Sequence, residues 1–143
     1  MTTDCEGLFE GDPQSLSPLV LAYIGDAVFE LWVRGHLVQS GGRRMCSLHQ
    51  QAVGLVNAGS QADILKTWAP HLNEAEMNIV KRGRNTKSGV PRGAKVSDYR
   101  LSTGLEALVG YLYLAGEKGR LAQLFSLAFK ARQDMDNLVE KEQ

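Results

Sequence analysis

The sequence predicts an all-helical domain. Apolar residues recur at helical spacing in several stretches, and no stretch sustains the strict apolar–polar alternation of a half-buried strand. The chain has 143 residues, of which 43% are hydrophobic and 22% charged, as in an ordinary soluble domain. We expect one ordered domain over residues 16–138, between a flexible N-terminal tail (1–15) and a short C-terminal tail (139–143).

The first half of the chain contains two predicted helices. Ser17 and Pro18 are a typical helix opening, with serine as the N-cap and proline in the first helical position. This helix is expected to run to about Val38 and to stop at the glycines 41–42. A second helix is expected over roughly 48–68, followed by Pro70.

The second half begins with a short helix that ends near Arg82, because Asn73 followed by Glu76 matches a capping box. Residues 83–97 contain three glycines and one proline, so we expect a loop there. Two further helices are expected, one from Ser97 or Asp98 to about Gly116 and one over about 119–138.

Two isolated acids stand out in apolar helices. Asp26 lies in the run LAYIGDAVFELWV, and Glu106 is the only acid between Tyr99 and Ala115. Burying an ionised carboxylate costs several kcal/mol unless a partner or a metal compensates it. Each acid alone is explained by an arginine salt bridge or a structural hydrogen bond. Together they point to a shared cation site.

A second feature is a strongly basic segment. Residues 81–100 hold seven bases and one acid, Asp98, so the segment carries +6 while the whole chain is neutral. Arginine and lysine at this density suit a phosphate backbone, although a solvated loop is the simpler alternative. The candidate RNA-binding residues are Lys81, Arg82, Arg84, Asn85, Lys87, Ser88, Arg92, Lys95 and Arg100.

Several other classes of protein find no support in the sequence. The two cysteines form no metal or disulfide pattern, the acidic start is unlike a secretory leader, and no apolar run is long enough for a membrane span. Nucleotide-binding loops, zinc-protease motifs and nucleophile elbows are absent from the sequence. We therefore expect a cytoplasmic protein.

Both acid-bearing stretches resemble a known family. LAYIGDAVFELWV is similar to the signature helix of the ribonuclease III catalytic domain, and STGLEALVGYLYL is similar to its second carboxylate helix. The order LAYIGDA, SLH, SQADIL, KRGRN and GYL is similar to that of the bacterial Mini-ribonuclease III group. The resemblance covers roughly residues 16–130.

The sequence departs from the larger family at two carboxylate positions. Ala22 stands where ribonuclease III has a glutamate, and Thr103 stands where it has an aspartate. The Mini-ribonuclease III group shows the same reduction, which leaves the number of metal ions open. No double-stranded-RNA-binding domain is expected here.

The resemblance implies a homodimeric, Mg²⁺-dependent endoribonuclease that cuts double-stranded RNA to 5′-phosphate and 3′-hydroxyl ends. Asp26 and Glu106 would be its catalytic and metal-binding residues, and its substrate would be the stem of the large-subunit (23S) ribosomal RNA precursor. Two alternatives stay open at this point. One is a non-catalytic RNA-duplex-binding or ribosome-assembly factor, and the other is a helical scaffold whose acids are salt-bridged.

Overall fold

The prediction of an all-helical fold is confirmed. The computed structural model describes residues 9–86 and 89–142, apart from the side chains of 139, 140 and 142, and this part of the chain contains no strand. Single 3₁₀ turns lie at Pro13–Ser15 and Ala69–His71. The α-helices are α1 (Pro18–Gln39), α2 (Met45–Val56), α3 (Ala58–Trp68), α4 (Glu74–Arg84), α5 (Val96–Leu114) and α6 (Lys118–Glu142).

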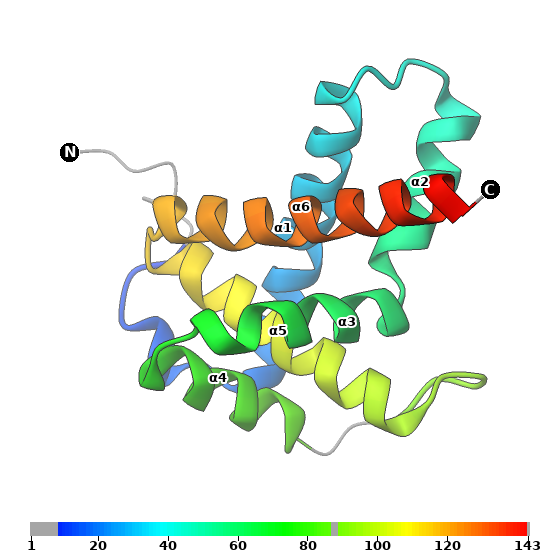
Figure 1. The fold of residues 1–143 in the computed structure, drawn as a ribbon. Helices are drawn as coiled ribbons and strands as arrows, with labels where there is room; N and C mark the ends of the chain where they lie inside the picture. Colours follow the sequence, from blue (N-terminus) through cyan, green and yellow to red (C-terminus); the bar gives the residue numbers. More distant parts are fainter. Residues whose placement is uncertain (1–8, 87–88, 143) are drawn as a thin grey trace.

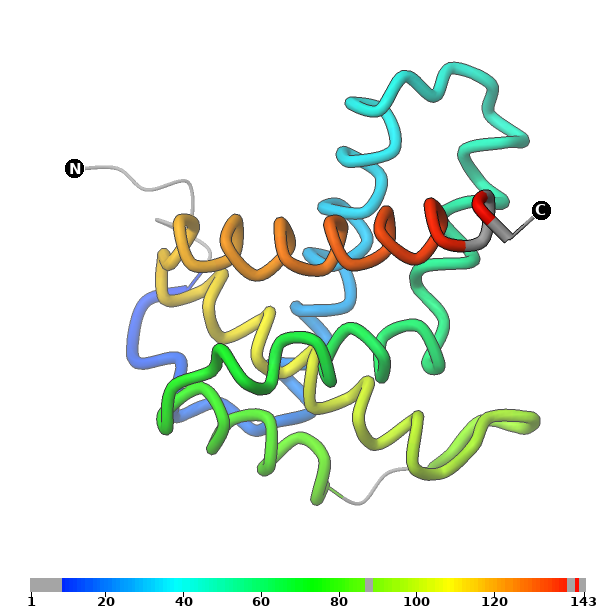
Figure 2. Tube along the Cα trace, viewed as in Figure 1, coloured from blue at the N-terminus to red at the C-terminus, as the bar shows by residue number. Residues whose placement is uncertain are grey.

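Helix α5 is the centre of the fold. It packs most extensively against α1, and it also contacts α4, α3 and α6 (Figure 1). Figure 2 shows that α1 and α2 are joined by a turn that projects from one end of the molecule, while the described residues 89–95, which lead into α5, project from the other end. The buried side chains of α5, from Ser102 to Leu112, therefore lie among several other helices.

Aromatic residues fill the core beneath α6. The Phe125 ring lies 5.5 Å from the rings of Phe29 and Trp68 and stacks on Trp32 at 4.9 Å between centroids. Offset and edge-to-face pairs of this kind contribute about 0.5–1.5 kcal/mol each beyond their burial. They fix α6 onto α1 and α3.

The helix expected over 48–68 is two helices in the structure. Asn57 adopts an extended conformation, with φ −74° and ψ 161°, and its side chain accepts a hydrogen bond from the Ser60 amide. The Asn57 amide group also donates to the carbonyl oxygens of Val53 and Gly54. One asparagine therefore caps the end of α2 and the start of α3, so the chain turns without leaving these backbone groups unpaired.

Other boundaries agree with the sequence more closely. The Ser17 side chain accepts from the Val20 amide, and Asn73 and Glu76 form the expected capping box. Helix α4 continues through Gly83 to Arg84, two residues beyond the predicted end. The last helix also extends further than expected, to Glu142.

Candidate active site

Asp26 and Glu106 come from the two helices that pack most closely. Asp26 lies on α1, and Glu106 lies near the middle of α5. Glu106 is partly buried, as its apolar surroundings predicted, but Asp26 is exposed. The expected burial of Asp26 was wrong, because its apolar neighbours in the sequence are divided between the core face of α1 and an exposed face.

The two carboxyl groups interact directly. Burial of Glu106 and, after it, a hydrogen bond and charge repulsion from Asp26 raise the pKa of Glu106 to about 8. Two neighbouring carboxylates repel each other when both are ionised, so Glu106 keeps its proton at neutral pH unless a cation compensates the pair. The two isolated acids of the sequence are therefore neighbours in the structure, and their role as a cation site stays a prediction.

The structure does not support the simpler explanations for the two acids. Among the described residues, neither Asp26 nor Glu106 forms a salt bridge with a basic side chain. The hydroxyl groups of Ser102 and Thr103 donate to the Tyr99 carbonyl oxygen, not to Glu106. The nearby acid Glu30 pairs instead with Arg34, at 2.9 Å.

The donor set fits a hard divalent cation held by few protein ligands. Mg²⁺ commonly takes one or two carboxylates and completes its shell with water and substrate phosphate. Within residues 9–86 and 89–142, no group of three or more His, Cys, Asp or Glu side chains is placed to hold a metal. Asp26 and Glu106 would therefore be its protein ligands, and the buried Ala22 and Thr103 add none.

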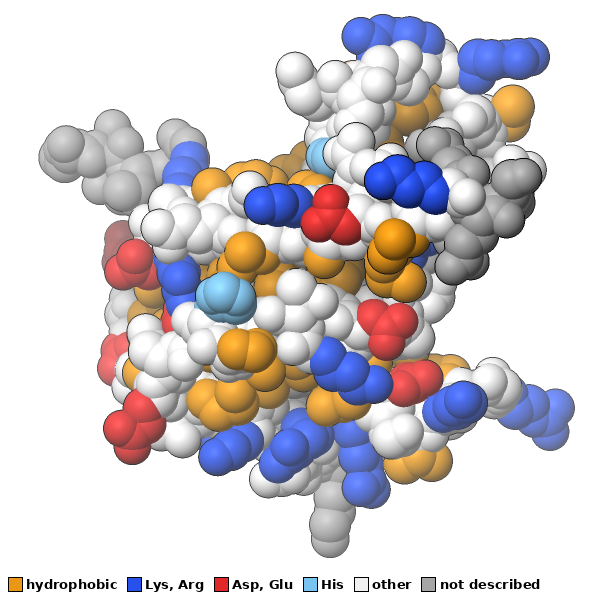
Figure 3. Space-filling view, viewed as in Figure 1, with side chains coloured by type: hydrophobic (Ala, Val, Ile, Leu, Met, Phe, Trp, Pro, Cys, Tyr) orange, Lys and Arg blue, Asp and Glu red, His pale blue; other side chains and the backbone are white. Residues whose placement is uncertain are grey.

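The described RNA-binding candidates lie at the end of α4, before α5 and on the first turns of α5, and α4 packs against α5 near Glu106. Gly104, two residues before Glu106, packs against the Val80 carbonyl and the Arg84 amide of α4. Basic side chains gather along the lower edge of the molecule, below α4 and the start of α5 (Figure 3). We call the exposed set Lys81, Arg82, Arg84, Arg92, Lys95 and Arg100 the basic edge.

The basic edge is only partly a loop. Lys81, Arg82 and Arg84 occupy the last turn of α4, and Asn85 is its C-cap. Positive charge at a helix C-terminus interacts favourably with the helix dipole. None of the six basic residues forms an ion pair with another described residue. Lys87 and Ser88, also predicted to bind RNA, lie outside the described residues.

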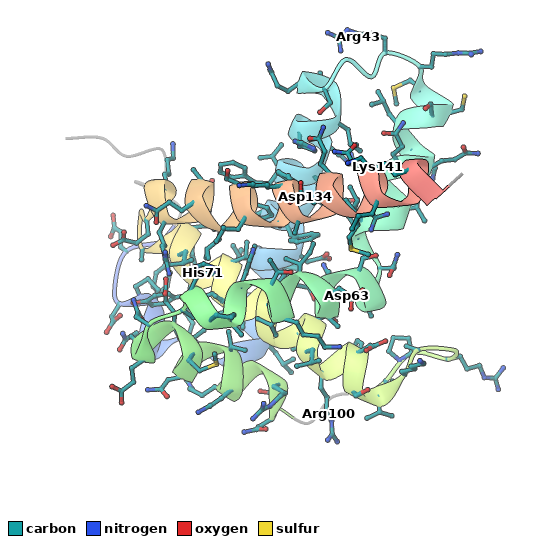
Figure 4. All side chains as sticks on the ribbon, viewed as in Figure 1. Arg43, Asp63, His71, Arg100, Asp134 and Lys141 are labelled. Atoms are coloured by element: carbon teal, nitrogen blue, oxygen red, sulfur yellow. The ribbon has the colours of Figure 1, made fainter. Side chains whose placement is uncertain are left out.

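Asp98, the only acid of the basic segment, lies near the start of another helix. Asp98 is half-buried, and its carboxylate lies near Gly59 in the first turn of α3. An acid is favoured at a helix N-terminus. Asp98 lies in the first turn of α5 and near the start of α3, and it forms no ion pair with a described residue of the basic edge. Figure 4 shows Arg100 at this edge, at the opposite end of the molecule from Arg43.

The sequence did not lead us to expect an exposed apolar surface on α1. Tyr23 is 76% exposed and Leu31 is 68% exposed, although both belong to the run that looked like core. Leu19 and Val20 continue this surface at one end. The signal was present in the sequence, because a helix that is apolar all round must be covered on every side. We call Leu19, Val20, Tyr23 and Leu31 the α1 outer face.

Comparison with known proteins gives the class to which this fold and site belong. The sequence-family model of the ribonuclease III domain matches residues 19–117 of this chain, a range that includes Asp26 and Glu106. A crystal structure of protein FN1578 from Fusobacterium nucleatum is similar, with a TM-score of 0.77 and 32% identity over 86% of this chain and 99% of that one. The fold and its carboxylate pair thus define a ribonuclease III domain.

Similar proteins identify a narrower group within the ribonuclease III family. Mini-ribonuclease 3 of Symbiobacterium thermophilum is 48% identical over 82% of this chain and 91% of its own length. The Mini-ribonuclease 3 proteins of Brevibacillus brevis and Desulfitobacterium hafniense are each 47% identical, over 82% and 78% of this chain and 89% and 71% of their own lengths. The chain belongs to the Mini-ribonuclease 3 group of the ribonuclease III family, and it is an endoribonuclease. No helix in its described part has the length and apolarity to cross a membrane.

Proposed function

We propose that this endoribonuclease is a Mg²⁺-dependent enzyme that cuts double-stranded RNA and matures the ends of the 23S ribosomal RNA precursor in the cytoplasm. The observation that carries the proposal is the Asp26–Glu106 pair on α1 and α5, together with the basic edge on α4 and at the start of α5, which packs against α4. An RNA duplex held by its phosphates along the basic edge would present its backbone to the carboxylates.

Each part of the site has a distinct role in this proposal. Asp26 and Glu106 hold the cation, which supplies Lewis-acid activation of water and neutralises charge on the phosphate. The basic edge, with Asn85, Lys87 and Ser88, binds phosphates and ribose and positions the duplex without reading its bases. Hydrolysis leaves a 5′-phosphate and a 3′-hydroxyl group.

The proposed active form is a homodimer that joins two copies through the α1 outer face. Tyr23 and Leu31 of this face are exposed on the same helix as Asp26, and exposed apolar surface beside a functional residue is typical of an interface. A twofold arrangement would place one carboxylate pair on each strand of a duplex. Two sites would then produce a double-strand cut.

A cleavage assay tests the proposal. The purified protein is incubated with a duplex carrying the joined ends of a 23S rRNA precursor and with an unrelated duplex, while Mg²⁺ is titrated. We expect Mg²⁺-dependent cutting of both strands, preference for the precursor stem, and loss of cutting in Asp26→Asn and Glu106→Gln. Ends are mapped by ligation that requires a 5′-phosphate.

Two outcomes would contradict the proposal. Binding of the duplex without cutting at any Mg²⁺ concentration would favour a non-catalytic RNA-binding or ribosome-assembly factor. Cutting by Asp26→Asn at the wild-type rate would exclude the carboxylate pair as the catalytic site. As a matched control, Glu30→Gln on the same helix removes an exposed carboxylate and is expected to cut normally.

A further inference from the structure

The backbones of α1 and α5 touch at Gly25 and Gly110. A Cβ atom added at Gly25 would overlap the Glu106 carbonyl oxygen and lie 2.9 Å from the Gly110 nitrogen. A Cβ atom added at Gly110 would overlap the Leu21 carbonyl oxygen and lie 3.0 Å from the Gly25 nitrogen. Only glycine on both helices allows this approach, since any larger residue would have to push the helices apart.

This contact involves the carboxylate residues themselves. Gly25 precedes Asp26 in the chain, and the atom against which it packs is the main-chain oxygen of Glu106. The contact therefore fixes the two main chains from which the carboxylates extend. Both glycines have ordinary negative φ angles, so their small size and not their conformational freedom is what the structure requires.

We propose that Gly25 and Gly110 are positioning residues that set the separation of the Asp26 and Glu106 carboxylates and thereby the affinity of the pair for a divalent cation. The inference rests on the proposed metal site. Functional groups must be held within about 0.5 Å of their working geometry, and a displacement of about 1 Å can cost a hundredfold in rate. A methyl group at either glycine exceeds that tolerance.

A second glycine contact provides a matched control. A Cβ atom at Gly83 would lie 2.9 Å from the Gly104 Cα atom and 3.0 Å from the Ala107 Cβ atom. This contact joins α5 to α4, on the side that carries no carboxylate of the pair. Gly83→Ala should therefore disturb packing without changing the separation of Asp26 and Glu106. A Cβ atom at Gly35, on α1, would meet nothing within 4 Å. Gly35→Ala therefore controls for the effect of replacing a helical glycine by alanine without a steric clash.

The experiment measures binding of Mn²⁺ alone, in the absence of RNA, from the electron paramagnetic resonance signal of the free ion. The variants are Gly25→Ala, Gly110→Ala, Gly83→Ala and Gly35→Ala, with the melting temperature recorded for each. Gly25→Ala and Gly110→Ala are expected to bind Mn²⁺ at least ~10-fold more weakly. Gly83→Ala should lower the melting temperature but bind Mn²⁺ like the wild type, and Gly35→Ala should change neither.

A rescue variant separates positioning from general loss of structure. In Gly25→Ala the carboxylates are expected to move apart, so Asp26→Glu in that background should restore part of the lost Mn²⁺ affinity. Asp26→Glu alone should weaken binding, because its extra methylene does not fit the wild-type spacing. Asp26 is exposed, so this single variant is expected to fold even if both glycine variants do not.

The outcomes are decisive in each case. Wild-type Mn²⁺ affinity in folded Gly25→Ala and Gly110→Ala, or equal weakening in Gly83→Ala, would overturn the inference. If the glycine variants do not fold, wild-type affinity in Asp26→Glu would overturn it and weakened binding would support it. If the wild type itself binds no Mn²⁺ that Asp26→Asn removes, the proposed metal site fails, which is a different result from failure of the positioning role.

Discussion

The Glu106 carboxyl group on α5 is hydrogen-bonded to Asp26 on α1. The pKa of Glu106 is raised to about 8, first by burial and then by the adjacent Asp26, so at neutral pH Glu106 keeps its proton and can donate it to the Asp26 carboxylate. A divalent cation held by Asp26 and Glu106 would compensate their negative charge and favour the ionised form of Glu106, so metal binding would be coupled to proton release. The metal-free state therefore carries an electrostatic cost that depends on pH.

The first prediction concerns the stability of the metal-free protein as a function of pH. The pKa of Glu106 is near 4.5 in the unfolded chain and about 8 in the folded one, so between these values the folded state binds more protons. The free energy of unfolding in EDTA should therefore fall as pH rises from 5 to 8, by up to about 1.4 kcal/mol per pH unit.

Glu106→Gln should remove most of this dependence. The variant is expected to match the wild type near pH 5 and to be more stable at pH 8, by on the order of 2 kcal/mol. Urea denaturation at several pH values, followed by circular dichroism, measures both. The exposed Glu30→Gln should keep the wild-type profile. A wild-type profile that stays flat between pH 5 and 8 would mean that Glu106 is ionised throughout.

The second prediction concerns the basic edge. Replacing Arg82, Arg84 and Arg92 by alanine should weaken duplex binding by a similar factor for every sequence and reduce the slope of log K against log salt, because fewer counterions are released. Binding is measured with Ca²⁺ in place of Mg²⁺, on the assumption that Ca²⁺ supports binding without turnover. The melting temperature should change little, since all three side chains are exposed.

A charge-matched variant provides the control for this experiment. Lys66, Lys130 and Lys141 are exposed lysines away from the basic edge, and their replacement removes the same total charge. Equal slopes for the two triple variants would show that net charge governs binding and that the basic edge has no special role. A large loss of stability in the first variant would instead assign its arginines to a structural network.

The sequence predicted the helices best where a local signal marks their ends. Ser17 and the Asn73–Glu76 capping box mark helix starts, because each forms hydrogen bonds within a few residues. Both caps are present in the structure. The pairing of Asp26 with Glu106 was also predictable, because two isolated acids in apolar helices call for a common explanation. Helix starts are thus predictable from local hydrogen bonds, and the pairing of the two acids from the energetic cost of isolated buried charge.

Features that depend on the neighbouring helix were not predictable. Glycine at 83 suggested a loop, yet it lies within α4, where the absence of a side chain lets α4 approach Gly104 of α5. The apolar run around Asp26 suggested burial, but periodicity does not tell which of two apolar faces meets the rest of the chain. Asn57 looked like a polar residue within one long helix, and only its hydrogen bonds show that it ends α2 and begins α3.

The third prediction concerns the oligomeric state. Tyr23→Lys or Leu31→Glu should convert the proposed homodimer into a monomer, because each places a charge at the centre of the α1 outer face. Light scattering coupled to size-exclusion chromatography measures the mass. The secondary structure should be retained, since both side chains are exposed in a single chain. Met135→Glu introduces the same change on α6 and should leave the mass unchanged. A monomeric wild type would contradict the proposed dimer.

The last prediction concerns the ion pair that joins α4 to α6. Arg120 donates to both carboxylate oxygens of Glu76, at 2.8 and 2.9 Å, and also to the His71 carbonyl oxygen. The Glu76 side chain is only 5% exposed and accepts a further bond from the Asn73 amide. Removing one partner of a buried pair leaves the other charge uncompensated, so Glu76→Gln should destabilise the fold by about 3 kcal/mol.

The pH dependence of this pair has the opposite sign to that of Glu106. The hydrogen bond from Arg120 holds the pKa of Glu76 below its usual 4.5, so its contribution is complete above that value and is lost as pH falls through the lowered pKa. Glu76→Gln should therefore flatten the acid limb of the stability curve. Arg34→Ala, which breaks the exposed pair with Glu30, should cost less than about 1 kcal/mol. An equal cost for both variants would show that the buried pair contributes no more than a surface one.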